Sequence, residues 1–95
     1  MFDLAAFGTY AADAIERNEA AELAAIAEAA ERLVDWPSDH VRTAAVYGFL
    51  EGLTNHCLGE PERCPFQRLV RYLGPAAIAA CRELDDHWGT QTPGV

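Results

Sequence analysis

The strongest constraint on the fold is the spacing of the apolar residues, which recur every three or four positions along most of the chain. This spacing matches the 3.6-residue period of an α-helix and predicts helices over residues 2–17, 19–36, 38–56 and 75–88. A shorter helix is expected to open at Pro65, because proline is well tolerated at the first helical position. Alanine is abundant and β-branched residues are few, which also favours helix over strand.

Each predicted helix is expected to bury an apolar stripe, and the helix over 38–56 is the most apolar of them. Between Val41 and Leu53 it has only three clearly polar residues, so we expect it to be central and buried on most sides. The other stripes are Leu4, Phe7, Gly8, Ala11, Ala14 and Ile15; Leu23, Ile26, Ala27, Ala30, Leu33 and Val34; Phe66, Leu69, Val70 and Leu73; and Ala77, Cys81, Leu84 and Trp88.

Turn and capping residues mark the predicted helix boundaries. Asn18 ends the first helix, Pro37 ends the second, and Ser38 is a good N-cap for the third. An irregular connector is expected over 57–64, and Gly74-Pro75 is a signal that ends one helix and begins another.

The two helices over 19–36 and 38–56 are joined by a tight turn and resemble the antiparallel hairpin of a HEAT-type repeat. A solenoid needs about three such units, and only one is present. We therefore predict an all-α fold, a compact bundle of about five helices with a HEAT-like hairpin. Residues 1–88 are expected to form a single helical domain, and residues 89–95 an irregular C-terminal tail.

Negative charge is concentrated in the first two thirds of the chain. The chain has 15 acidic residues, 7 arginines and no lysine, for a net charge of −8. Residues 1–62 carry twelve acids and three arginines, whereas residues 63–95 carry three acids and four arginines. An acidic field repels nucleic acid and anionic lipid, so we expect no direct contact with either. It attracts a basic protein surface, although solubility alone is the simpler explanation of the charge.

The three cysteines, Cys57, Cys64 and Cys81, are an odd number. The start of the sequence lacks the basic segment of a signal peptide, and no apolar run approaches the roughly 18 residues of a membrane span. We therefore expect reduced thiols and a cytoplasmic protein.

No motif in the sequence predicts catalysis, a cofactor or a metal. A structural zinc site needs four ligands, usually in closely spaced pairs, and His56, Cys57 and Cys64 do not provide them. Cys64 precedes a predicted helix and adjoins Arg63, which is the setting of a reactive thiol, but inert packing is the preferred interpretation. We expect a protein that is not an enzyme.

Acidic side chains line the polar faces of the first two predicted helices. Tyr10 lies off the apolar stripe among acids, a composition typical of an interface hot spot. For any single acid the simpler interpretation is a solvated face with pairs such as Asp13–Arg17. For the surface as a whole we expect a protein partner. The residues predicted to contact it are Asp3, Tyr10, Asp13 and Glu16 of the first helix, Glu28, Glu31 and Asp35 of the second, and Glu60 and Glu62 of the connector.

The second half of the chain resembles a family of small, all-helical bacterial proteins. Residues 41–53 read VRTAAVYGFLEGL, and the family pattern there is roughly an acid, then Val-Arg-Asn-Ala, then Phe-Leu-Glu. Thr43 stands where the family has asparagine. The resemblance covers residues 38–95 well and residues 1–37 only in pattern. Its later matches are Tyr72-Leu73-Gly74-Pro75, Cys81, Leu84, Trp88-Gly89 and Thr92-Pro93-Gly94.

Members of this poorly characterised family are interpreted as immunity proteins of polymorphic toxin systems. The resemblance implies a protein that neutralises a cognate toxin by covering its active site or substrate groove. The acidic charge suits a toxin with a basic surface, and the free protein is expected to be a monomer or a weak homodimer. The alternative is a self-associating adaptor or structural domain.

Overall fold

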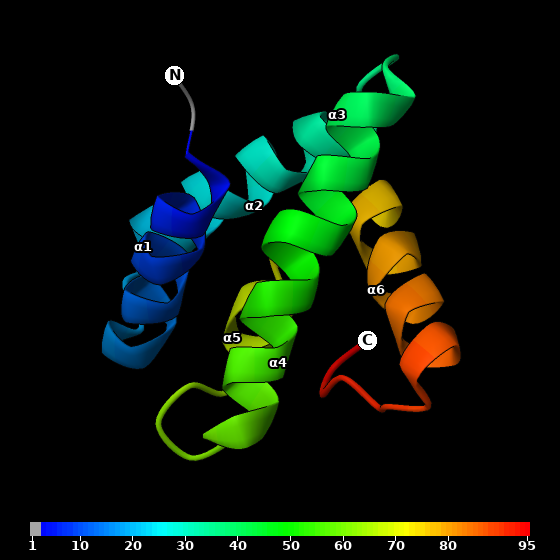
Figure 1. Cartoon of the computed structure of the whole chain (residues 1–95). Helices are drawn as coiled ribbons and strands as arrows, with labels where there is room; N and C mark the ends of the chain where they lie inside the picture. Colours follow the sequence, from blue (N-terminus) through cyan, green and yellow to red (C-terminus); the bar gives the residue numbers. More distant parts are fainter. Residues whose placement is uncertain (1–2) are drawn as a thin grey trace.

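The computed structural model describes residues 3–95, and Figure 1 shows helices joined by short connections. Because α3, η1 and α4 follow one another without a break, we call them together the central helix. The described residues then form five helices and no strand, which confirms the predicted all-α fold. Phe2, where the first predicted helix begins, lies outside the described residues. The elements are α1 (Leu4–Arg17), α2 (Ala20–Val34), α3 (Asp39–Thr43), the π-helical segment η1 (Ala44–Leu50), α4 (Glu51–Gly59), α5 (Gln67–Val70) and α6 (Pro75–Trp88).

The central helix organises the packing. In Figure 1, α1 and α6 lie on either side of it and α2 crosses behind it, and all three contact it. Phe49, Leu50 and Leu53 are among its buried residues, as its apolar composition predicts. One side nevertheless stays exposed and carries Tyr47 and Gly52.

The middle of the central helix is π-helical, over Ala44–Leu50. A π-turn accommodates one more residue than an α-turn, and apolar spacing does not predict it. The helix also continues to Gly59, so the prediction that the connector begins at Cys57 is wrong by about one turn. The helix reaches this far because Cys57 is buried in the core, and it ends before Pro61, whose ring disfavours helical backbone at the preceding residue.

Several helix ends have the predicted caps. Asn18 is the C-cap of α1 with φ 54°, the left-handed conformation that asparagine tolerates. The Ser38 hydroxyl accepts a hydrogen bond from the Val41 N–H at 3.4 Å. The sequence did not predict the N-cap of α1, which is Asp3; its carboxylate accepts hydrogen bonds from the N–H groups of Ala5 and Ala6.

The N-terminus of α6 is capped from another helix. Its N-cap, Gly74, has no side chain, and Pro75 has no N–H, so the first free donors are the N–H groups of Ala76 and Ala77. Both donate to Glu31 of α2, at 2.9 and 2.8 Å. A Cβ at Gly74 would lie 2.5 Å from the Glu31 carboxyl carbon, so glycine leaves the space that this carboxylate occupies. We call this arrangement the Glu31 cap.

The C-terminal tail is irregular, as predicted, but it packs against the protein. Thr92 is buried, and Val95 contacts the core. The Asp85 carboxylate accepts hydrogen bonds from the hydroxyls of Thr90 and Thr92, both at 2.7 Å, and from the Thr92 N–H at 3.0 Å. Asp85 therefore holds the tail against the end of α6.

We expect the docking of the tail to depend on pH. Burial by itself raises the pKa of Asp85, but the hydrogen bonds from Thr92 and Thr90 outweigh it and hold the pKa below the ordinary value of 3.8. A lowered pKa means that the carboxylate stabilises the fold above the ordinary value and that this contribution is lost as pH falls through the lowered one. Hydrogen exchange of the Thr92 amide should therefore be slow at pH 6, and its protection should be lost progressively as pH falls below 3.8 and through the lowered pKa of Asp85.

The same exchange measurement on variants tests whether the Asp85 carboxylate is what protects the Thr92 amide. Asp85→Asn should expose the Thr92 amide at pH 6, at a cost of about 1–2 kcal/mol in local stability. Asp86→Asn is the matched control, because this neighbour is exposed. Equal protection of Thr92 in both variants would show that another contact holds the tail.

The prediction that Trp88 belongs to the buried stripe of the last helix is wrong. Its side chain is 57% exposed, and Leu84 is the last buried residue of α6. The indole N–H donates to Glu51 of α4 at 2.8 Å. An indole needs a hydrogen-bond acceptor, and here the acceptor lies at the surface.

Candidate functional site

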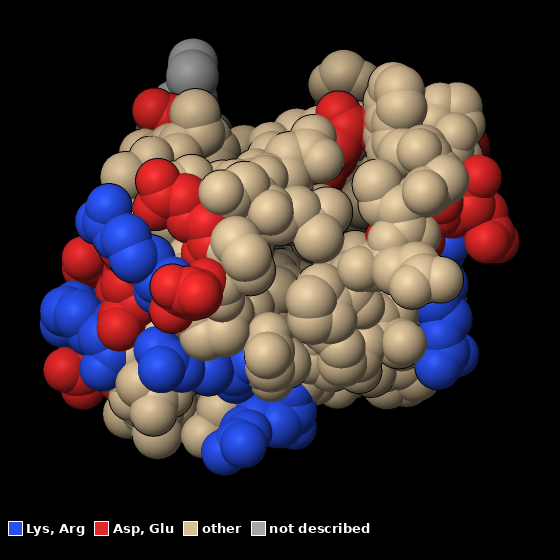
Figure 2. Space-filling view, turned by 90° about the horizontal axis from the view of Figure 1, so that it is seen from below, with Lys and Arg blue, Asp and Glu red and all other residues tan. Residues whose placement is uncertain are grey.

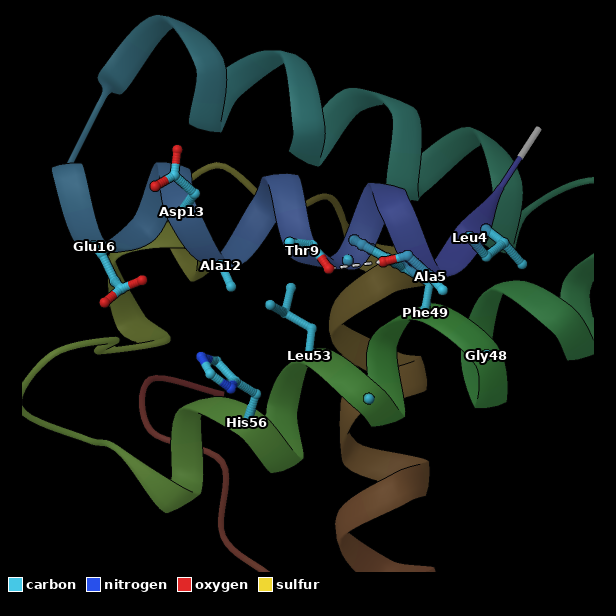
Figure 3. A pocket seen from close by; sticks show the side chains of 12 residues that line it. Leu4, Ala5, Thr9, Ala12, Asp13, Glu16, Gly48, Phe49, Leu53 and His56 are labelled. Atoms are coloured by element: carbon cyan, nitrogen blue, oxygen red, sulfur yellow. Dashed lines mark hydrogen bonds between the residues drawn. The ribbon is translucent and has the colours of Figure 1, made fainter. Parts of the chain in front are cut away.

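A groove of about 510 Å³ lies between α1 and the central helix (Figure 3). Its walls are largely apolar, and five of its residues have no side chain beyond a methyl group. Two helices lined by such residues leave an open channel that larger side chains would fill. The lining consists of Leu4, Ala5, Gly8, Thr9, Ala12, Asp13 and Glu16 of α1 with Gly48, Phe49, Gly52, Leu53 and His56 of the central helix.

The glycines set the width of the groove. A Cβ added at Gly48 would lie 3.5 Å from Leu4, and one at Gly8 would lie 4.0 Å from Phe49. At Gly52 an added Cβ would meet nothing within 4 Å, so this position faces open space. Below them the Phe7 and Phe49 rings stack with centroids 4.6 Å apart and join α1 to the central helix.

Acidic residues lie at one end of the groove. Figure 3 places Glu16 of α1 and His56 of α4 at this end, with Asp13 one turn earlier on α1 and its carboxylate directed away from the central helix. Glu16 pairs with Arg63 at 2.9 Å, and Asp13 pairs with Arg17 at 2.9 Å. Arg17 also pairs with Glu19 at 3.5 Å and Glu22 at 3.0 Å, so Asp13 belongs to a network of charges. Arg63 is the more exposed of the two arginines, and a cationic group of a partner could replace it beside Glu16.

The structure brings together two predicted contact residues that are distant in the sequence. Glu60 also pairs with Arg63, at 3.4 Å, so Glu16 and Glu60 share one arginine. Figure 2 shows arginines and acids interspersed on one side of the molecule. Much of the acidic charge expected to attract a partner is thus already paired within the protein.

The other predicted contact residues lie outside this groove. Tyr10 is 44% exposed, and the exposed carboxylates include Glu28, which pairs with Arg32 at 2.6 Å. The carboxylate of Glu31 is used in the cap of α6, so it has a structural role that the sequence did not reveal. The remaining predicted residues, Asp3, Asp35 and Glu62, are also exposed.

Sequence reasoning missed the main residues of the groove wall. Gly48 and Gly52 were treated as part of a helix buried on most sides, but both are exposed. The available signal was their spacing, because residues four apart lie on one face of a helix and two glycines there leave a slot.

Another hollow, of about 340 Å³, adjoins the groove at Leu4, which lines both. It is almost wholly apolar and includes Trp36, which is 52% exposed. Exposed tryptophan beside an apolar hollow is a frequent feature of protein interfaces.

The three thiols are buried and have the opposite character to a catalytic thiolate. Burial raises the pKa of Cys81 to about 12 and raises the pKa values of Cys57 and Cys64 above the ordinary value. All three are therefore protonated at neutral pH. Over residues 3–95, no three His, Cys, Asp or Glu side chains gather closely enough to hold a metal ion. No helix in that range has the length and apolar character that crossing a bilayer requires.

The fold and the groove define a small all-α domain. A family model described as "Domain of unknown function (DUF7674)" matches residues 1–89, and the chain belongs to this family. No curated protein and no solved structure matched the chain.

Proposed function

We propose that this domain is an immunity-type protein, which binds a bacterial toxin domain and covers its active site or substrate groove. The observation that carries the proposal is the open groove between α1 and the central helix, with Asp13 and Glu16 at one end. Residues 38–95 resemble a family whose members are interpreted as immunity proteins, and this resemblance is the reason for proposing a toxin as the partner.

The lining of the groove indicates which kind of partner segment would bind there. Its largely apolar walls suit an apolar segment, and the acids at its end suit a lysine or arginine of the same segment. Complementary charge speeds the encounter and disfavours wrong partners, whereas the apolar contact supplies most of the affinity. A toxin that acts on nucleic acid or nucleotides has a basic surface of this kind.

A variant that fills the groove without disturbing the fold tests the proposal. Gly52→Leu adds a side chain where an added Cβ meets nothing within 4 Å, so we expect stability to be unchanged or slightly raised. Binding to the partner should weaken by at least about tenfold, because the leucine occupies the space of the partner segment. Titration calorimetry measures the affinity, and thermal unfolding checks the fold.

Gly59→Leu is the matched control. It is the same substitution on the same helix, it also meets nothing within 4 Å, and it lies outside the groove. The partner to test first is the product of the gene adjacent to the one that encodes this chain. Equal affinity of the two variants would place the interface elsewhere, and absence of binding together with failure to rescue cells that express the partner would contradict the proposal.

Self-association is the second candidate, and the exposed aromatic residues Trp36, Tyr47 and Trp88 favour it. Light scattering during size-exclusion chromatography separates the two functions. A monomer supports the immunity-type function, and a stable dimer whose formation Gly52→Leu prevents supports the adaptor.

A further inference from the structure

Two of the buried cysteines are in direct contact. The sulfur atoms of Cys57, near the end of α4, and Cys64, before α5, lie 2.8 Å apart. Backbone hydrogen bonds bring the chain back on itself between them. The Glu60 N–H donates to the Cys57 carbonyl at 3.2 Å, and the Cys64 N–H donates to the Glu60 carbonyl at 2.8 Å.

The contacts of the two thiols give them different roles. Either sulfur can donate in the contact between them, and we assign Cys57 as the donor because the Cys64 thiol also lies 3.8 Å from the Ala12 carbonyl, to which it can donate. Burial raises both pKa values, while the contact between the thiols adds to the increase for Cys57 and opposes it for Cys64. The Cys57 S–H beside the Cys64 sulfur can stabilise a Cys64 thiolate, so we assign Cys64 as the attacking thiol.

We propose that Cys57 and Cys64 form an intramolecular disulfide on oxidation by a peroxide, and that this bond staples the connector between α4 and α5. The sulfurs need to approach by less than about 1 Å to reach bonding distance. This proposal is independent of the proposed function.

The reaction takes place in two balanced steps. The Cys64 thiolate attacks one peroxide oxygen, the O–O bond breaks, and the leaving hydroxide takes a proton to become water. The Cys57 sulfur then attacks the sulfur of the resulting sulfenic acid, and the hydroxyl leaves with the Cys57 proton as a second water. Two thiols lose two electrons, and one peroxide is reduced to two waters.

The bond would fix one end of the groove. The residue before Cys64 is Arg63, which pairs with Glu16 of the groove and with Glu60. Because Cys57 and Cys64 are buried, the peroxide reaches them only when the exposed connector opens. Oxidation is therefore expected to be slow in the folded protein, and the bond, once formed, opposes further opening.

Peptide mapping of the whole protein tests the bond directly. The reduced, folded chain is incubated with hydrogen peroxide, denatured, alkylated and digested with trypsin. Cleavage after Arg63 separates the two cysteines, so residues 43–63 and 64–68 should remain joined only through the disulfide, two hydrogens lighter than their sum. Cys81, which is also buried but lies on α6, should be alkylated in its own peptide.

Thermal unfolding with and without reductant gives a second readout. Closing this short loop should raise Tm by roughly 10 °C in the oxidised protein. Cys57→Ala and Cys64→Ala should each abolish the difference between oxidised and reduced samples, and Cys81→Ala should retain it. Alkylation of all three cysteines after oxidation, a linkage that includes Cys81, or disulfides only between molecules would overturn the proposal.

Discussion

Replacing Phe49 with alanine is expected to lower the free energy of unfolding by about 3–5 kcal/mol, the range for removing a buried aromatic ring. Phe49 is 1% exposed and lies in the middle of the central helix. Its ring stacks on Phe7, so the substitution removes the contact that joins α1 to the central helix and leaves a cavity. Proteins of this size have a total stability of roughly 5–15 kcal/mol, so much of it would be lost. Urea unfolding followed by circular dichroism measures the change.

Tyr47→Ala is the control for this prediction. Tyr47 lies two residues earlier on the same helix and is 45% exposed, so its replacement should cost less than about 1 kcal/mol. Similar losses in both variants would contradict the prediction, because alanine is a better helix former than either aromatic residue and only the burial of Phe49 distinguishes the two positions.

Replacing Glu31 with alanine is expected to cost about 2–4 kcal/mol. The substitution leaves the N–H groups of Ala76 and Ala77 without their acceptor and removes a negative charge from the positive end of a helix. It also removes these hydrogen bonds between α2 and α6. Amide exchange of Ala76 and Ala77 should accelerate together with the fall in unfolding free energy. Glu28→Ala, one turn earlier on α2, removes only an exposed pair and should cost less than about 0.5 kcal/mol.

A double-mutant cycle tests whether Gly74 is needed because it leaves room for the Glu31 side chain. Gly74→Ala alone should destabilise the protein, because the new methyl group would overlap the Glu31 side chain. In the Glu31→Ala background the same change should cost little, since the space is then empty. If the losses in unfolding free energy of the two single variants simply add in the double variant, Gly74 is required for its backbone conformation and not for the Glu31 cap.

The helices and their buried faces were predictable because they depend on local spacing. The apolar stripe of α2, with Leu23, Ile26 and Ala27, is buried as the 3.6-residue period requires. Boundaries set by capping side chains, such as Ser38, were predictable for the same reason. Boundaries that depend on tertiary burial, such as the extension of α4 past Cys57, were not.

The candidate site was less predictable, because it depends on which helices meet. The acids at the end of the groove, Asp13 and Glu16, were identified from their position opposite the apolar stripe of the first helix. The contacts of Glu31 with α6 join residues 45 and 46 positions apart, and nothing in the local sequence indicates them. The same holds for Trp88, whose acceptor, Glu51, lies 37 positions away.

The small residues of the groove have a thermodynamic consequence for any ligand that enters it. Alanine and glycine have no rotamers, so Ala5 or Gly52 loses no side-chain entropy when it is covered. A surface of lysines or glutamates would lose up to about 2 kcal/mol for each side chain that became immobilised. These residues of the groove wall therefore have no side-chain freedom to lose when a ligand binds. The entropic cost of ordering falls mainly on the ligand.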